Sequence, residues 1–205
     1  MMSMELLFTT DEKELIETGI SEKYRKVAVS PSGLFQYPTG RQGLEALDYD
    51  QALIRQLPET IAASFCGVGN PFALGPIHKG EQVLDVGCGA AVDTILAGIM
   101  VGPSGRAIGI DIVPEMLNRA RENIREVALK NVGLMQASAE SIPFSDEVFD
   151  VVISNGVFNL VPDKRRSLGE IFRVLKPGGR LMMADQILSV APERDRKTMV
   201  ARWSQ

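Results

Sequence analysis

The sequence predicts an α/β fold, a doubly wound and mostly parallel sheet preceded by a separate N-terminal region. Over residues 76–188, short apolar runs alternate with longer segments of helical periodicity, which is typical of parallel strands joined by crossover helices. Within this region, the apolar run at residues 83–86 ends in a glycine turn before a helical pattern begins. The chain has 205 residues, which is enough for one domain with a sizeable buried core.

Residues 1–75 form a mixed region in which turn signals separate short helices. The first helix is expected over residues 11–18, with Thr10 as its N-cap. Two amphipathic helices are expected, divided by Pro58, at residues 49–57 and 59–65. The turn signals are rich in proline and glycine and lie at residues 30–33, 37–40 and 67–72.

Residues 76–188 carry the βα alternation, which assigns each element in chain order. Strands are expected where apolar residues cluster between turn signals, at residues 82–86, 106–110, 132–136, 148–154 and 179–188. Helices are expected between them, at residues 91–101, 114–129 and 163–174. Pro114 suits the first turn of its helix. Residues 192–205 are expected to begin a further helix.

The glycine turn indicates a nucleotide site that also attracts a cation. Glycines let the backbone approach a ligand closely, and the following helix N-terminus contributes a partial positive charge. Asp85, at the end of the first strand, repels a pyrophosphate but attracts an ammonium group. Val92 replaces the third glycine of a dinucleotide fingerprint, so a nicotinamide dehydrogenase is disfavoured. Asp111 follows Gly89 by 22 residues, near the position at which an acidic residue binds ribose hydroxyls.

Five motifs in order resemble those of the class I S-adenosylmethionine-dependent methyltransferases. They are VLDVGCGAA (residues 83–91), ID (110–111), SIPFSD (141–146), FDVVIS (149–154) and LKPGGRL (175–181). Five motifs in register are far more specific than any one of them. The resemblance implies a Rossmann-like sheet at residues 76–205, covered by residues 1–75 as a helical lid. It also implies methyl transfer (EC 2.1.1) from S-adenosyl-L-methionine, with S-adenosyl-L-homocysteine as the product.

The resemblance further assigns the cofactor-binding residues. Asp85 is expected to bind the cofactor's ammonium group, and Asp111 its two ribose hydroxyls. Ile112 and Met116 are expected to enclose the adenine, whose edge the backbone amide of Ala139 contacts. The remaining expected contacts come from Gly87, Cys88, Gly89, Glu140 and Asn155.

Each polar residue in this set also has a purely structural alternative. Asp85 could cap the amides of its own turn, Asp111 could cap the helix beginning at Pro114, and Asn155 could stabilise a turn. Met116 could be ordinary core. His78 is the only histidine and is expected at the surface, away from the carboxyl ends of the strands. No residue stands out as an obligate general base, so the catalytic residues are unassigned.

The identity of the acceptor is left open by the sequence. The end of the fourth strand, with residues 69–71 and 114–116, most resembles the arsenite methyltransferase branch, whose members hold arsenic(III) through cysteines. Val68 and Gly156 stand where two of those cysteines are expected, and Cys66 is either a shifted ligand or a small buried residue. Carbon methylation of a quinone or lipid precursor and a non-catalytic cofactor-binding module are the alternatives. The candidate substrate residues are Asn70, Asn159, Tyr24 and Tyr37.

Composition narrows the class of protein further. A net charge of −4 argues against a nucleic-acid partner, and no apolar run is long enough to span a membrane. Residues 1–11 lack the features of a secretory signal, and two cysteines do not make a disulfide framework. We therefore expect a cytoplasmic monomer or homodimer that acts on a small molecule without a metal. The family core adds an antiparallel hairpin after its fifth strand, and we expect this C-terminal strand pair to be missing.

Overall fold

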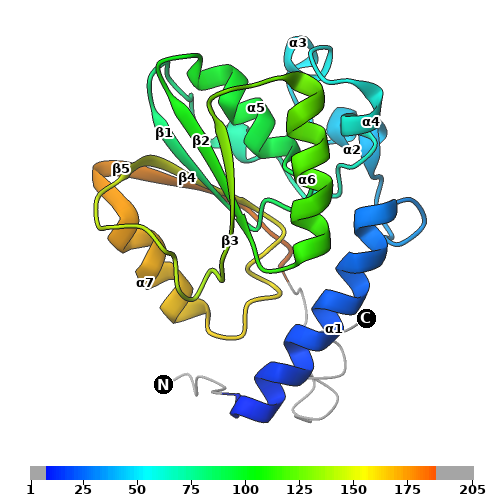
Figure 1. The fold of residues 1–205 in the computed structure, drawn as a ribbon, viewed down its shortest axis with the longest axis vertical. Helices are drawn as coiled ribbons and strands as arrows, with labels where there is room; N and C mark the ends of the chain where they lie inside the picture. The colour runs from blue at the N-terminus through cyan, green and yellow to red at the C-terminus, as the bar shows by residue number, and fades with distance from the viewer. Residues whose placement is uncertain (1–7, 188–205) are drawn as a thin grey trace.

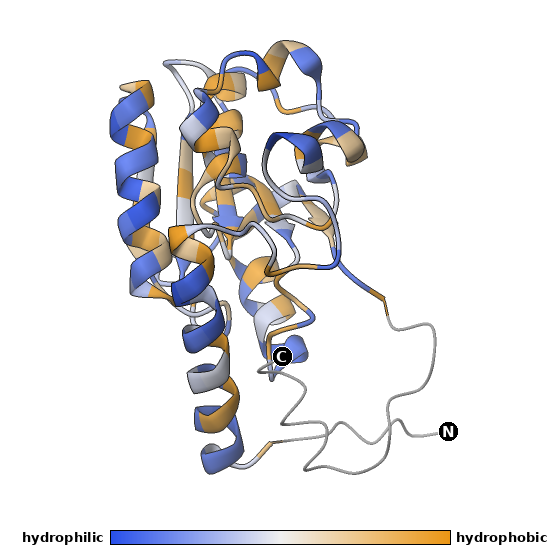
Figure 2. Cartoon of the chain, turned by 90° about the vertical axis from the view of Figure 1, so that its right-hand side faces the viewer, coloured by the Kyte–Doolittle hydropathy of each residue, from blue (hydrophilic) through white to orange (hydrophobic). Residues whose placement is uncertain are grey.

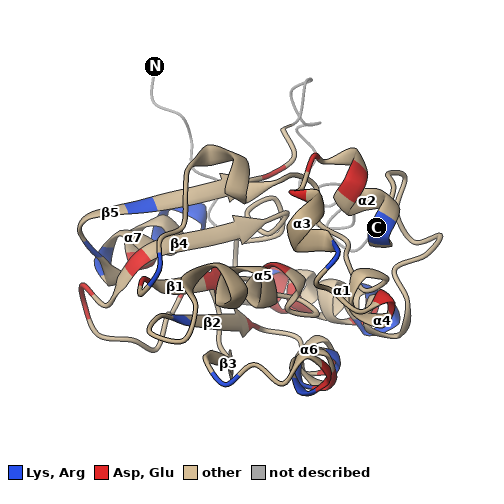
Figure 3. Cartoon of the chain, turned by 90° about the horizontal axis from the view of Figure 1, so that it is seen from above, with Lys and Arg blue, Asp and Glu red and all other residues tan. Residues whose placement is uncertain are grey.

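The structure, a computed structural model, describes residues 8–187 and is built around one parallel sheet. The described sheet has five strands in the order β3-β2-β1-β4-β5, and each neighbouring pair is parallel (Figures 1 and 3). The strands are β1 (Gln82–Val86), β2 (Arg106–Asp111), β3 (Val132–Gln136), β4 (Phe149–Asn155) and β5 (Leu175–Ala184). The predicted doubly wound α/β sheet is confirmed.

Helices cover both faces of the sheet. α5 (Val92–Val101) and α6 (Pro114–Val127) lie on one face, and α7 (Lys164–Val174) lies on the other (Figure 1). Neighbouring β1 residues point to opposite faces, so Val83 packs in the apolar cluster of α5 and Leu84 in that of α7. Hydrophobic residues accordingly gather along the sheet and on the helix surfaces facing it (Figure 2).

The strand order reverses between β1 and β4, and this reversal positions the site. From β1 the chain winds outward to β2 and β3, then returns to form β4 on the other side of β1. In open α/β sheets the crevice at the carboxyl ends of the strands beside such a reversal is where ligands bind. The ends of β1, β2 and β4 therefore define the candidate site.

The first helix is longer than the sequence predicted. α1 (Thr10–Val29) continues well beyond residue 18, and its N-cap is Thr9, which forms a capping box with Glu12. Its buried residues include Ile16 and Val27, which pack against the start of α6. This tertiary contact extends the helix past the point where sequence periodicity weakens.

The other N-terminal elements are short, and one of them, α2, was not predicted from the sequence. α2 (Gly40–Ala46) begins in a segment predicted to be a turn, because Pro38 and Gly40 are turn formers. The expected helices at 49–57 and 59–65 are reduced to α3 (Gln51–Ile54) and α4 (Glu59–Ala62), each continued by turns. The glycine turn near residue 70 leads into a short 3-10 helix, η1 (Pro71–Leu74).

The last strand begins and ends earlier than predicted. β5 starts at Leu175 rather than residue 179, because the chain pairs with Phe149 before a register shift and then again from Arg180. The helix expected at residues 192–205 lies outside the described residues. Among residues 8–187, no helix combines the length and apolar character needed to cross a bilayer.

Candidate functional site

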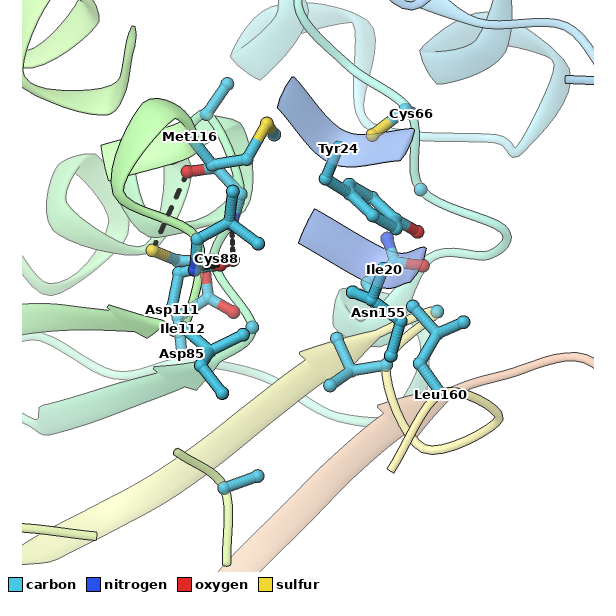
Figure 4. A pocket seen from close by; sticks show the side chains of 18 of the residues that line it. Ile20, Tyr24, Cys66, Asp85, Cys88, Asp111, Ile112, Met116, Asn155 and Leu160 are labelled. Carbon is cyan, nitrogen blue, oxygen red and sulfur yellow. Dashed lines mark hydrogen bonds between the residues drawn. The ribbon is translucent and has the colours of Figure 1, made fainter. Parts of the chain in front are cut away.

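A cavity at the carboxyl ends of β1, β2 and β4 is lined by two facing walls (Figure 4). The first, called here the turn wall, comes from the ends of β1 and β2 and the segments after them, with the side chains of Asp85, Cys88, Asp111, Ile112 and Met116. The second, called the cover wall, comes from α1, the loop after α4 and the end of β4, with Ile20, Tyr24, Cys66, Asn155 and Leu160.

The glycine turn of the first wall depends on residues without a side chain. Gly87 has a φ of +74°, and a Cβ atom there would lie 2.2 Å from a methyl carbon of Val157. The backbone amides of Gly87 and Cys88 both donate to the carbonyl of Ile110, at 2.8 and 2.9 Å. The turn is thus fixed to β2 and approaches the cover wall more closely than any other residue type would permit.

Ala91 completes this turn in a strained conformation. It is the N-cap of α5, fully buried, with φ +65° and ψ +27° in the left-handed region. An alanine there costs about 1–2 kcal/mol relative to the right-handed region, a cost that glycine avoids. Such strain persists only where the surrounding packing fixes the backbone.

Asp85 points into the cavity from the end of β1. One carboxylate oxygen accepts a hydrogen bond from the Thr94 hydroxyl at 2.6 Å, and the residue is 2% exposed. Burial, followed by the nearby charge of Asp93, raises the pKa of Asp85 well above its usual range. The carboxylate is therefore held in a fixed orientation but lacks a positive partner among the described residues.

Asp111 holds the turn and the following helix together. Its two carboxylate oxygens accept hydrogen bonds from the backbone amides of Gly89 and Val113, each at 2.8 Å. The structural alternative for Asp111 is thus present in the fold, and each oxygen keeps a second lone pair for a ligand. Burial raises the pKa of Asp111, although these backbone donors oppose the rise.

Both polar atoms of the Asn155 side chain form hydrogen bonds with other residues of the protein. Its side-chain oxygen accepts from the amides of Val68 and Gly69 at 2.9 and 3.1 Å. Its side-chain nitrogen lies within 3.1 Å of the Tyr49 hydroxyl, the Gly69 carbonyl and an Asp93 carboxylate oxygen. The amide can make no more bonds than these, so Asn155 clamps the loop of residues 67–69 to the end of β4.

The other predicted cofactor residues lie where the sequence placed them. Ile112, Met116 and Ala139 all line the cavity, as do the three residues of the glycine turn, Gly87, Cys88 and Gly89. Glu140 also lines it, but its carboxylate accepts from the Asp163 amide at 2.9 Å and pairs with Lys13 at 3.5 Å.

Of the four candidate substrate residues, only Tyr24 lines the described cavity. Tyr37 lies behind the cover wall, where its hydroxyl donates to the carbonyl of Cys66 at 3.1 Å. The Asn70 side chain caps η1 and donates to the carbonyl of Asp48. Asn159 is also away from the lining, with its side-chain oxygen buried and unpaired in the described part of the chain.

The cover wall is neutral around its thiol. Burial, followed by the negative charges of Asp111 and Asp93, raises the pKa of Cys66 to about 12. Burial also raises the pKa of Tyr24 well above its usual range. Both groups are therefore protonated at neutral pH, and neither is a ready thiolate or phenolate.

The lining as described is acidic. Its acidic side chains are Glu17, Asp85, Asp93, Asp111 and Glu140, and no lysine, arginine or histidine is among the described lining residues. A site of this composition favours a cationic ligand and disfavours the phosphates of a dinucleotide.

Several residues of this site were missed in the sequence, including three that orient other side chains of the site. Asp93 and Thr94 lie in the first turn of α5, and Tyr49, 2% exposed, donates to Asp93 at 2.8 Å. An acidic residue in a first turn is common in any helix, so Asp93 carried no distinctive signal. Tyr49 was placed in an amphipathic helix, and its role depends on partners far away in sequence.

Comparison with known proteins agrees with the motifs seen in the sequence. A family described as a methyltransferase domain matches residues 77–201, more than half of the chain. An arsenite methyltransferase of Halobacterium salinarum is 40% identical over 157 residues, covering 77% of this chain and 40% of that protein. A demethylmenaquinone methyltransferase of Listeria welshimeri is 44% identical over 110 residues, covering 53% of this chain and 46% of that protein.

A solved structure extends the agreement to the fold. A SAM-dependent methyltransferase from Aquifex aeolicus is similar with a TM-score of 0.53 and 26% identity, covering 76% of this chain and 79% of that one. The chain spans less than half the length of both curated relatives that it matches. With five motifs in order, a cavity at the expected edge of the sheet and a family match over most of the core, the chain belongs to the class I S-adenosylmethionine-dependent methyltransferases.

Proposed function

We propose that this protein transfers a methyl group from S-adenosylmethionine to a small-molecule acceptor by direct displacement. The observation that carries the proposal is the acidic lining, with no described basic side chain, beside a glycine turn at the reversal of strand order. S-adenosylmethionine carries an ammonium and a sulfonium against one carboxylate, so its net charge is positive. Carboxylates without fixed cations are suited to such a ligand, whereas a pyrophosphate would be repelled.

The residues of the turn wall suit each part of the cofactor. Asp85 is oriented by Thr94 to receive the ammonium, and Asp111 is fixed by two backbone amides to receive the ribose hydroxyls. Ile112 and Met116 supply apolar surface for the adenine. The cofactor, once bound, supplies an electrophilic methyl group. The chain's own contribution is then to align the acceptor and exclude water, which can provide much of the rate enhancement in such transfers.

The lid is the second part of the proposal. α1 contributes Ile20 and Tyr24 to the cover wall, and it is tied to the core by an ion pair between Arg25 and Glu115 at 2.9 Å. A helix in this position would restrict access to the cavity and shield the methyl group from water. In keeping with the composition, we place the enzyme in the cytoplasm, as a monomer or homodimer.

A carbon acceptor is the second candidate for the substrate, beside a soft arsenic centre. Val68 and Gly156 are neighbours, since a Cβ on Gly156 would lie 3.2 Å from a Val68 methyl carbon. The two positions that would carry cysteines in the arsenite branch thus adjoin each other but hold no thiol. The Cys66 thiol, with its pKa raised to about 12, is protonated at neutral pH. Without a thiolate on the cover wall, a carbon acceptor such as a quinone precursor fits the site better than an arsenic centre that needs thiolate ligands.

The cofactor is tested by calorimetric titration with S-adenosylmethionine, S-adenosylhomocysteine and NAD in parallel. We expect micromolar binding of both adenosyl ligands and none of NAD. Binding of NAD, or no binding of either adenosyl ligand, would contradict the proposal. Binding of both without methyl transfer to any acceptor tried would instead favour a cofactor-binding module without catalysis.

The acceptor is tested by transfer of a labelled methyl group to glutathione-bound arsenite and to a demethylated quinol. Cys66→Ser is the matched variant, because it replaces the one thiol of the cover wall with a hydroxyl of similar size. A carbon acceptor predicts transfer to the quinol that survives this substitution. Transfer to arsenite that is lost in Cys66→Ser would overturn the carbon proposal and make Cys66 the arsenic ligand.

A further inference from the structure

Asp93 is a buried carboxylate that lies where the two walls of the cavity meet. It is 7% exposed, belongs to the first turn of α5 and lines the cavity. One oxygen accepts from the Tyr49 hydroxyl at 2.8 Å, and the other accepts from the Asn155 amide at 2.9 Å. Asn155 connects it to the cover wall, while its place after the glycine turn connects it to the turn wall.

Burial disfavours the charged form of Asp93 and raises its pKa to about 6, while the hydrogen bonds from Asn155 and Tyr49 oppose that rise. The N-terminus of α5 contributes a partial positive charge, and both donors are oriented toward the carboxylate. No ion pair involves Asp93 in the part of the chain that the structure describes. Burial of a carboxylate without a counter-ion is costly, and such groups are common where a ligand completes the charge balance.

The charge of Asp93 acts on both walls. It contributes to the raised pKa of Asp85 on the turn wall and to that of Cys66 on the cover wall. If Asp85 receives the ammonium of the cofactor, a second positive charge, that of the sulfonium, is left to be balanced between the walls. Apart from Asp85, Asp93 is the buried carboxylate of the described lining, and its two oxygens are held by neutral donors.

We propose that Asp93 recognises the sulfonium charge and so makes the site favour S-adenosylmethionine over S-adenosylhomocysteine. The inference rests on the proposed function. Methyl transfer breaks the sulfur–methyl bond and leaves its electron pair on sulfur, which converts the sulfonium into a neutral thioether. The adenine, ribose, ammonium and carboxylate are identical in the two ligands, so a group that senses the charge at sulfur distinguishes substrate from product.

The experiment compares the affinities of the two ligands in the wild type, Asp93→Asn and Tyr49→Phe, by calorimetry at neutral pH. Asp93→Asn removes the charge at nearly constant volume, and we expect its affinity for S-adenosylmethionine to fall about tenfold, equivalent to about 1.4 kcal/mol. Its affinity for S-adenosylhomocysteine should change less than about twofold. Tyr49→Phe is the second variant. It removes one hydrogen bond that favours the charged form of Asp93 but keeps the carboxyl group, so the affinity for S-adenosylmethionine should fall less than in Asp93→Asn.

Equal losses of both ligands in Asp93→Asn would mean a structural role and would overturn the inference. A third ligand, sinefungin, tests the inference on the wild-type protein, so the test does not depend on the folding of a variant. Sinefungin carries an amine in place of the methylsulfonium, so the wild type should bind it more like S-adenosylmethionine than like S-adenosylhomocysteine. Equal affinity of the wild type for all three would overturn the inference alone, whereas no binding of any adenosyl ligand would overturn the proposed function with it.

Discussion

The turn wall and the cover wall face each other across one cavity but are assembled from different kinds of sequence. The turn wall comes from two short segments, and its geometry is set by backbone bonds such as those from Gly87 and Cys88 to Ile110. The cover wall is gathered from α1, a loop near residue 67 and the end of β4. The turn wall also supplies ionised or ionisable carboxylates, whereas the cover wall near Cys66 and Tyr24 is neutral. Under the proposed function, the turn wall would hold the cofactor and the cover wall would face the acceptor.

Substitution of Asp111 should break the turn wall and have the largest effect. Asp111→Ala removes the acceptor of two backbone amides as well as the proposed ribose partner. We expect affinity for S-adenosylmethionine to fall about 100-fold and the free energy of unfolding to fall by about 1–3 kcal/mol. Calorimetry and chemical denaturation measure the two effects. Asp146→Ala, at an exposed carboxylate that pairs with Arg173, is the control. It should leave the affinity unchanged and alter the free energy of unfolding by less than about 1 kcal/mol.

The pH dependence of S-adenosylmethionine binding should test the role of charge between the walls. Burial raises the pKa of Asp93 to about 6, and Asp85, Tyr49 and Cys66 are the titratable groups around it. A cation binds the ionised form better, so affinity for S-adenosylmethionine should rise about tenfold from about pH 5 to about pH 7.

The unfolding equilibrium of the free protein should show the opposite trend for the same group. The unfolded carboxyl ionises first, so the stability that Asp93 contributes is full below about pH 4 and lost as the pH rises through about 6. In Asp93→Asn, both the affinity for S-adenosylmethionine and the free energy of unfolding should depend less on pH over this range. A pH profile of binding that is unchanged in this variant would assign the titration to another group.

Ala91 offers a smaller effect confined to the turn wall. Ala91→Gly relieves a left-handed alanine, and we expect the free energy of unfolding to rise by about 1 kcal/mol. Ala90→Gly is the matched control at the neighbouring buried alanine, whose φ is not positive, and it should lower the stability instead. Denaturant titration of the two variants measures both, and loss of stability in both would show that the strain is absent.

The smallest effect is expected on the cover wall. Cys66→Ser replaces a protonated thiol with a hydroxyl group of similar size. We do not expect the cofactor to depend on this group, so the affinity for S-adenosylmethionine should change less than about twofold. Calorimetry measures it beside the wild type. A tenfold loss would mean that the cover wall also binds the cofactor, and the division between the walls would fail.

The turn wall could be predicted from the sequence because its signals are local. Gly87, Asp85 and Asp111 lie next to glycines or strand ends, so spacing alone places them at one edge of the sheet. The role of Asn155 could not be predicted, because the residues that it clamps lie 86 and 87 positions earlier in the chain. α1 and α2 were misjudged for a related reason, since tertiary packing rather than local propensity sets their lengths.

The clamp made by Asn155 also has a consequence for the order in which the molecule folds. The bond between Gly89 and Asp111 closes a segment of 22 residues, whereas that between Tyr49 and Asn155 closes one of 106. Closing the longer loop costs about 1.4 kcal/mol more in chain entropy. We therefore expect the glycine turn to gain hydrogen-exchange protection early in refolding and the loop at residues 67–69 to gain it late. Under the proposed function, the turn that would receive the ribose would then form before the wall that faces the acceptor.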